Sequence, residues 1–70
     1  MVQVLFLQNF NAEGLSGPGW NAQHKLLKSF KIGDEALVYH VDGFDWIEKD
    51  GEKFSIFFLY LLQNKIVQLK

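Results

Sequence analysis

The sequence contains no cysteine, no arginine and no threonine, and only one of its 70 residues is proline. Without cysteine the chain can form neither a disulfide bond nor a thiolate zinc site, which are common supports of very small domains. Its two histidines, His24 and His40, are not joined by an H-x-x-x-H or H-E-x-x-H spacing. The sequence therefore predicts no metal site and no cofactor, and association with another chain is the expected source of additional stability.

The absence of arginine bears on nucleic-acid binding. All seven basic residues are lysine, and the formal net charge is -1. Arginine is the side chain best suited to paired hydrogen bonds with phosphates and guanines, and a net charge near zero attracts no polyanion over long range. The composition thus argues against nucleic acid as a partner, and an oligonucleotide-binding barrel is the third of three functional alternatives.

Long apolar runs are missing as well. The longest, residues 56–62, is far shorter than the roughly 20 residues that cross a bilayer. Residues 1–7 are apolar, but they lack the basic segment and the small-residue cleavage site of a targeting signal, so they are predicted to form a strand. We expect a soluble, cytoplasmic protein with no membrane partner.

What the sequence does contain is apolar side chains, because 49% of its residues are hydrophobic and 16% are aromatic. High hydrophobicity with low net charge predicts a folded chain, and this length suits one small domain over residues 1–70. A domain of this size buries only about 60% of the surface of its unfolded chain. We therefore expect a marginally stable domain that gains from a partner.

Several segments have the composition and alternation of β-strands, namely residues 2–8, 35–41, 45–49, 53–62 and 66–69. Asp42-Gly43 and Asp50-Gly51 predict tight turns between these strands, the second of them in a type I′ hairpin.

The remaining segments predict a loop and a helix. Residues 9–19 hold three glycines and the only proline, which is typical of a loop. Residues 21–30 begin with Asn21 as an N-cap and carry Leu26, Leu27 and Phe30 as a narrow apolar stripe, which predicts a short helix that lies on the sheet.

The predicted order β-α-β-β-β-β indicates an α+β fold in which one short helix packs on an antiparallel meander sheet, as in cystatin-like rolls. The alternative is a small SH3-like β-barrel, because residues 30–38 (FKIGDEALV) resemble the opening of many such barrels. Residues 33–38, 54–62 and 64–67 are also loosely similar to the last strands of NTF2-like domains. That resemblance implies a ligand pocket, although the amino-terminal helices that supply most of such a pocket are missing here.

The predicted strand over residues 56–62 is apolar on both of its alternating faces. One short helix can cover only one face of the sheet. Because large exposed apolar patches usually mark interaction surfaces, we predict that the other face packs against a second copy of the chain or another protein, with a homodimer as the default. A barrel that buries one face internally is the alternative. The interface candidates are Ile56, Phe57, Phe58, Leu59, Tyr60, Leu61 and, in the loop, Trp20.

A second group of residues suggests a pocket. His40 alternates in phase with Asp42, and a histidine with a carboxylate on the same face is a conceivable acid–base pair. A hydrogen-bonded structural histidine produces the same pattern. No serine lies in a G-x-S-x-G motif, and no catalytic residue is predicted. The pocket candidates are Tyr39, His40, Asp42 and Trp46.

Together these features predict an interaction or accessory protein rather than an enzyme, one that self-associates through an aromatic-rich sheet face and the loop over residues 11–20. The alternative is a small ligand-binding or enzymatic domain of NTF2-like type whose pocket is completed by dimerisation. A closed apolar cavity around an unpaired His40 would favour the alternative, whereas an apolar face filled by a partner would favour the interaction protein.

Overall fold

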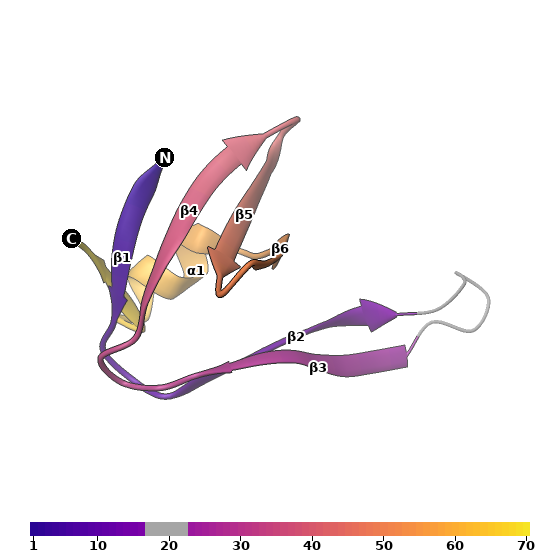
Figure 1. The fold of residues 1–70 in the computed structure, drawn as a ribbon, viewed down its shortest axis with the longest axis horizontal. Helices are drawn as coiled ribbons and strands as arrows, with labels where there is room; N and C mark the ends of the chain where they lie inside the picture. The colour runs from indigo at the N-terminus through magenta and orange to yellow at the C-terminus, as the bar shows by residue number, and fades with distance from the viewer. Residues whose placement is uncertain (17–22) are drawn as a thin grey trace.

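The computed structural model describes residues 1–16 and 23–70 (Figure 1). In this part of the chain most residues belong to antiparallel strands, and one short helix precedes the last strand. The elements in chain order are β1 (Val2–Phe6), β2 (Phe10–Ser16), β3 (Gln23–Phe30), β4 (Glu35–Val41), β5 (Phe44–Lys49), β6 (Glu52–Ser55), α1 (Phe58–Gln63) and β7 (Val67–Leu69).

The strands form a five-stranded sheet of order β6-β5-β4-β1-β7 and a separate two-stranded hairpin, β2-β3. β1 lies inside the sheet, with Val2 opposite Val38 of β4 and Phe6 opposite Val67 of β7. The outer strands of the sheet are therefore β6 and β7. Figure 1 shows that the β2-β3 hairpin extends away from the sheet, and α1 packs beside β7.

Two tight turns connect β4 to β5 and β5 to β6. Asp42 and Gly43 have positive φ angles of 53° and 83°, and Asp50 and Gly51 have 54° and 79°. Two successive positive φ angles define the type I′ turn, whose twist matches that of the flanking strands. The turns predicted at both dipeptides are confirmed.

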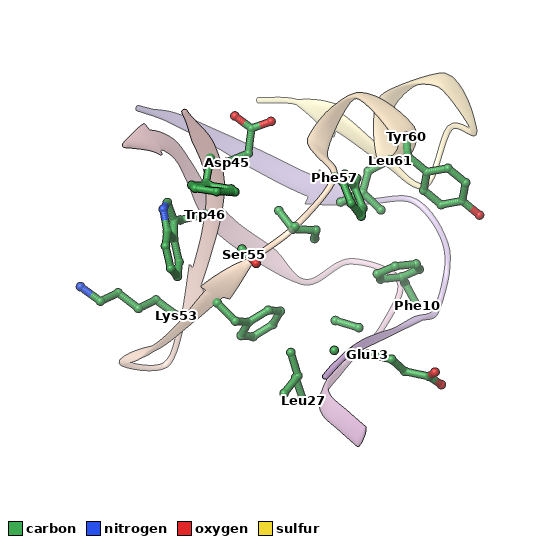
Figure 2. Close-up of a pocket in the computed structure, with 15 residues that line it drawn as sticks. Phe10, Glu13, Leu27, Asp45, Trp46, Lys53, Ser55, Phe57, Tyr60 and Leu61 are labelled. Carbon is green, nitrogen blue, oxygen red and sulfur yellow. The ribbon is translucent and has the colours of Figure 1, made fainter. Parts of the chain in front are cut away.

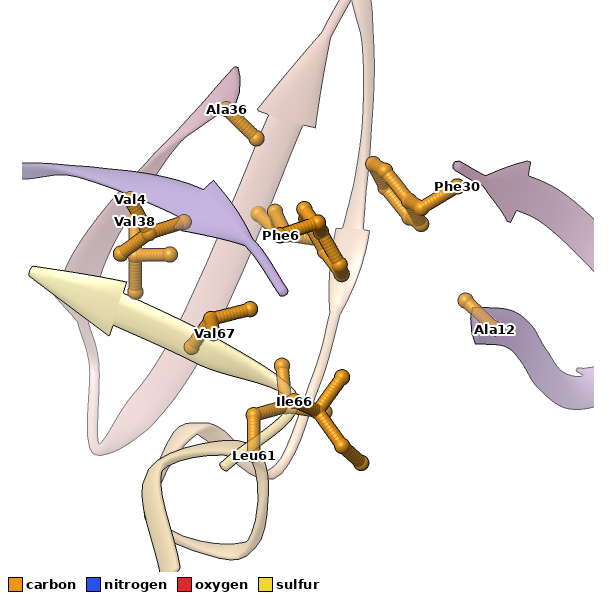
Figure 3. Packing of buried hydrophobic residues seen from close by; sticks show 10 residues of the cluster. Val4, Phe6, Ala12, Phe30, Ala36, Val38, Leu61, Ile66 and Val67 are labelled. Atoms are coloured by element: carbon orange, nitrogen blue, oxygen red, sulfur yellow. The ribbon is translucent and has the colours of Figure 1, made fainter. Parts of the chain in front are cut away.

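Phe30 joins the hairpin to the sheet. Its ring stacks on that of Phe6, with centroids 4.3 Å apart and planes 6° apart, and it meets Phe54 of β6 at 6.2 Å. Figure 3 shows Phe30 and Ala12 reaching from the hairpin toward the β1 side chains. No buried polar side chain is found in the described residues. The buried core consists of Val4, Phe6, Ala12, Phe30, Ala36, Val38, Ile47, Leu61, Ile66 and Val67.

The helix predicted over residues 21–30 is wrong, because Gln23–Phe30 forms β3 instead. The stripe of Leu26, Leu27 and Phe30 fits a helix of two to three turns, but a helix this short gains little stability by itself. Pairing with β2 satisfies the backbone of the segment and places Phe30 between two other rings of the core. The predicted N-cap, Asn21, lies outside the described residues.

The loop predicted over residues 9–19 is also wrong in its first part, since Phe10–Ser16 forms β2. Alternate residues of β2 face the core: Ala12 is buried and Phe10 packs against the buried cluster. Glycine at position 14 obscured this alternation in the sequence. Residues 17–19 lie outside the described part of the chain.

The long strand predicted over residues 53–62 is wrong beyond Ser55, where β6 ends. The apolar residues that follow form α1, Phe58–Gln63. A sheet strand would have needed cover on both faces, whereas the helix buries Leu61 and leaves other apolar side chains exposed. Six residues are too few to cross a bilayer, and no longer apolar helix is found among the described residues.

Candidate functional site

A groove of about 850 Å³ separates the β2-β3 hairpin from β6 and α1 (Figure 2). Apolar side chains make up most of its lining, and the aromatic ones come from the hairpin, from β5, from β6 and from the start of the helix. The groove is partly open to solvent. Its lining residues are Phe10, Ala12, Glu13, Gly14, Leu27, Phe44, Asp45, Trp46, Lys53, Phe54, Ser55, Ile56, Phe57, Tyr60 and Leu61.

The hairpin wall is shaped by a β-bulge. The pairing moves from Ala12 opposite Lys28 to Glu13 opposite Leu26, so Leu27 is the additional residue on β3. A bulge redirects the side chain it carries. Here the Leu27 side chain lies against Gly14, where a β-carbon would come within 2.8 Å of Leu27 Cδ1. Glycine at position 14 thus allows Leu27 to lie on the hairpin surface that faces the groove.

The opposite wall is the entry to α1. Leu61 is buried in the core and fixes the helix, and its amide N–H donates to the Phe57 carbonyl at 3.3 Å. Phe57, just before the helix, is 85% exposed, and Tyr60 is 54% exposed. Two large aromatic side chains are therefore held at the rim of the groove, in contact with solvent, by a buried neighbour.

β6 lies between the two walls, and the groove reaches both of its faces. Ser55 is opposite Trp46 and Phe54 is opposite Ile47, so Ser55 and Trp46 share one face of the sheet while Phe54 and Ile47 share the other. Figure 2 shows Trp46 and Lys53 on one side of β6 and Phe10 and Leu27 on the other. The apolar lining therefore continues around the outer edge of the sheet.

Three charged residues, Glu13, Asp45 and Lys53, line the groove. Asp45 is bound by the His40 ring, whose Nδ1 lies 2.9 Å from Asp45 Oδ1. Glu13 is exposed on the hairpin wall, and none of the ion pairs between described side chains includes it. Lys53 is exposed on β6, and most of the remaining lining residues are apolar.

Two ion pairs connect the hairpin to the sheet at the turn between β5 and β6. Lys28 Nζ lies 3.4 Å from Glu52 Oε2 and 3.7 Å from Asp50 Oδ2, both at the turn between β5 and β6. The Lys28 side chain is only 18% exposed, while both carboxylates are largely in solvent. Together with the buried Phe30 ring, these contacts hold the hairpin beside the β5–β6 turn.

The interface candidates predicted from the sequence divide into three groups. Phe57 and Tyr60 line the groove and are exposed, and Leu59 is exposed on α1 outside it. Leu61 is buried, whereas Ile56 and Phe58 are half-buried and pack against the core. Trp20 lies outside the described residues.

Of the pocket candidates, Tyr39 and Trp46 are opposite each other on β4 and β5, but the four do not form one pocket. Trp46 lines the groove, but His40 is exposed near the tip of the β4–β5 hairpin, where it binds Asp45 rather than Asp42. Asp42 is in the turn itself. Tyr39 donates its hydroxyl to Glu48 Oε1 at 3.4 Å on the sheet face.

Sequence reasoning missed the hairpin wall entirely. The sequence predicts a loop at Phe10 and a helix at Leu27, and therefore places neither of them near Phe57 or Tyr60. Gly14 was the available signal, because an isolated glycine within a strand pattern suggests a bulge or a close backbone approach. In the described residues no cluster of three or more His, Asp or Glu could hold a metal ion. No protein-family model, curated protein or solved structure matches the chain.

Proposed function

We propose that this domain is a protein-interaction module that binds an apolar segment of another protein in the groove between the β2-β3 hairpin and α1. The observation that carries the proposal is the exposure of large aromatic side chains at this groove, led by Phe57 at 85%. Exposed apolar surface that is continuous and rimmed by charge is typical of interaction sites. Aromatic anchors in a concave site are the side chains that contribute most to such binding.

The sheet supports a finer proposal about the fold. It is an antiparallel meander whose first strand also pairs with the last, in the order β6-β5-β4-β1-β7. The small SH3-like barrel, suggested by residues 30–38, accommodates this order better than a roll in which a sheet wraps a helix over residues 21–30. We propose the barrel as the architecture that carries the groove.

A peptide selection tests the proposed function. The domain has two tryptophans, so a Trp20→Phe variant makes Trp46, in the groove, the only tryptophan reporter. We expect a random-peptide library displayed on phage to yield apolar sequences. Their synthetic forms should shift the Trp46 emission to shorter wavelength in a saturable manner, because binding removes water from the ring.

The selected peptides must compete with one another for one site. A selection that yields no shared apolar pattern, or peptides that bind without changing Trp46 emission, would contradict the proposed function. A scrambled version of each peptide, at the same composition and charge, is the control for nonspecific adsorption.

Self-association is the second candidate, and one observation favours it: Leu59 is 65% exposed on α1 beside Phe57, so the apolar surface extends past the groove. A homodimer through this surface would sediment at about 16 kDa, twice the 8.1 kDa of the chain. Phe57→Asp should then return it to a monomer without unfolding it. A monomer for the unsubstituted chain at all micromolar concentrations would exclude this candidate.

A further inference from the structure

β6 is an outer strand of the sheet, and its register shows which backbone groups are free to bond outward. The Ile56 amide N–H donates to the Asp45 carbonyl at 2.9 Å. In an antiparallel pair, residues alternate between those that bond to the neighbour and those that point away. Phe54 therefore bonds to β5 as Ile56 does, and the N–H and C=O groups of Lys53 and Ser55 point away from it.

The turn between β5 and β6 gives the same result independently. Asp50 and Gly51 form a two-residue type I′ loop, and Lys49 pairs with Glu52 as the closing pair of the hairpin. The closing pair of such a hairpin is hydrogen-bonded, so alternate residues from Glu52 onward face β5. Lys53 falls between them, in agreement with the pattern at Ile56.

The side chains around this edge fit an added strand. The side chains of a strand alternate between the two faces of its sheet. On one face of β6 an added strand would lie beside Lys53 and Ser55, with Trp46 of β5 beyond them. On the other face it would meet Leu27 and Phe10 of the hairpin. The groove thus offers apolar surface to both sets of side chains and backbone partners between them.

We propose that the segment bound in the groove is extended and adds to the sheet as a sixth strand, hydrogen-bonded to the backbone of Lys53 and Ser55. This inference rests on the proposed function and specifies the conformation of its partner. Backbone pairing supplies affinity in such strand addition, and side-chain pockets supply specificity. The bound segment has large apolar side chains on both of its faces.

A single segment of a partner fits here better than a second folded copy of the chain. The hairpin stands opposite β6 across the groove and is held there by Phe30 and by the ion pairs of Lys28. The groove of about 850 Å³ between this wall and β6 offers space for one extended chain, and a second folded sheet would need the hairpin to move aside.

Charge complementarity predicts one further feature of the bound segment. Glu13 is the exposed carboxylate of the hairpin wall, and no ion pair is formed with it among the described side chains. A lysine or arginine of the partner beside it completes an ion pair at the rim. The partner is therefore an extended apolar segment with a basic residue where it passes Glu13 of the hairpin.

The test compares two substitutions at one position, using the full chain and a selected peptide. Ser55→Ala removes only the hydroxyl, whereas Ser55→Pro also removes the outward N–H, which β5 does not use. Proline is tolerated on outer strands when its missing N–H faces outward. We expect the Ser55→Pro variant to bind the peptide about tenfold more weakly than the Ser55→Ala variant, because the peptide carbonyl loses its donor.

A scan of the peptide keeps the test decisive if Ser55→Pro fails to fold. Single N-methyl groups are placed at successive backbone nitrogens of the peptide, and binding to the unsubstituted chain is measured. We expect strong losses at every second position, since only alternate amides face β6. Equal affinity of the two Ser55 variants together with a scan lacking this alternation would overturn strand addition. A different result would contradict the proposed function itself, namely that the peptide does not occupy the groove at all.

Discussion

Replacing Phe30 with alanine should lower the free energy of unfolding by about 3 to 5 kcal/mol. Phe30 is 1% exposed and lies between Phe6 and Phe54, so the substitution leaves a cavity between the hairpin and the sheet. Stacked aromatic pairs add roughly 0.5 to 1.5 kcal/mol beyond the buried area, and one such pair is lost. For a domain this small the loss is a large share of the total stability.

Urea unfolding followed by circular dichroism measures this effect. Ile32→Ala is the matched control, because Ile32 is close in sequence but 68% exposed, and it should change the stability by no more than about 0.5 kcal/mol. A Phe30→Ala variant as stable as Ile32→Ala would mean that the hairpin is not held by this ring.

Replacing Phe57 with alanine should weaken the binding of a groove-bound peptide by about 30-fold, which is the effect of removing a hot-spot side chain worth about 2 kcal/mol. Phe57 is 85% exposed in the free domain, so its removal creates no cavity. Folding and binding are thus separated in this variant. The unfolding free energy should stay within about 0.5 kcal/mol of that of the unsubstituted chain.

Leu59→Ala is the matched control for Phe57→Ala. Leu59 is exposed on α1 to a similar degree but does not line the groove, so its substitution should leave peptide affinity almost unchanged. Titration of the Trp46 emission gives both affinities. Equal losses of peptide affinity in the two variants would contradict binding in the groove and would indicate that the peptide binds the outer face of the helix.

Much of the sheet could be predicted from the sequence, because its signals are local. Residues 35–41 alternate and form β4 with the expected bounds, and both Asp-Gly dipeptides form the expected turns. The first and last strands also lie where their composition placed them. These elements are specified by neighbouring residues, without reference to the rest of the fold.

The hairpin and the helix could not be predicted in this way, since distant contacts decide them. Residues 23–30 have good helix formers, but β2 and the rings of Phe6 and Phe54 favour a strand that inserts Phe30 into the core. Residues 58–63 continue an apolar run that predicts a strand, but three of the six are leucine, a good helix former, and no sheet face is available to cover both sides of a strand here. In residues 23–30 tertiary packing overrides a weak local preference.

The candidate site combines residues whose local sequence predicts their role with residues that only distant contacts bring to the site. An apolar surface around Phe57 and Tyr60 followed from the excess of apolar residues at positions 56–62, even though the strand assigned to them was wrong. The groove itself depends on the hairpin, and so Phe10 and Leu27 could not be placed in it beforehand. Its position beside the outer edge of β6 follows only from the three-dimensional arrangement.

Chemical-shift mapping of the ¹⁵N-labelled domain with a selected peptide tests most directly whether the groove is the binding site. β7 is the other outer strand of the sheet and carries the exposed Leu69, so it is the alternative binding edge among the described residues. We predict that the amide signals of Lys53, Ser55 and Phe57 shift together with those of the β2-β3 hairpin, while those of β7 stay in place. Shifts confined to β1 and β7 would contradict the account.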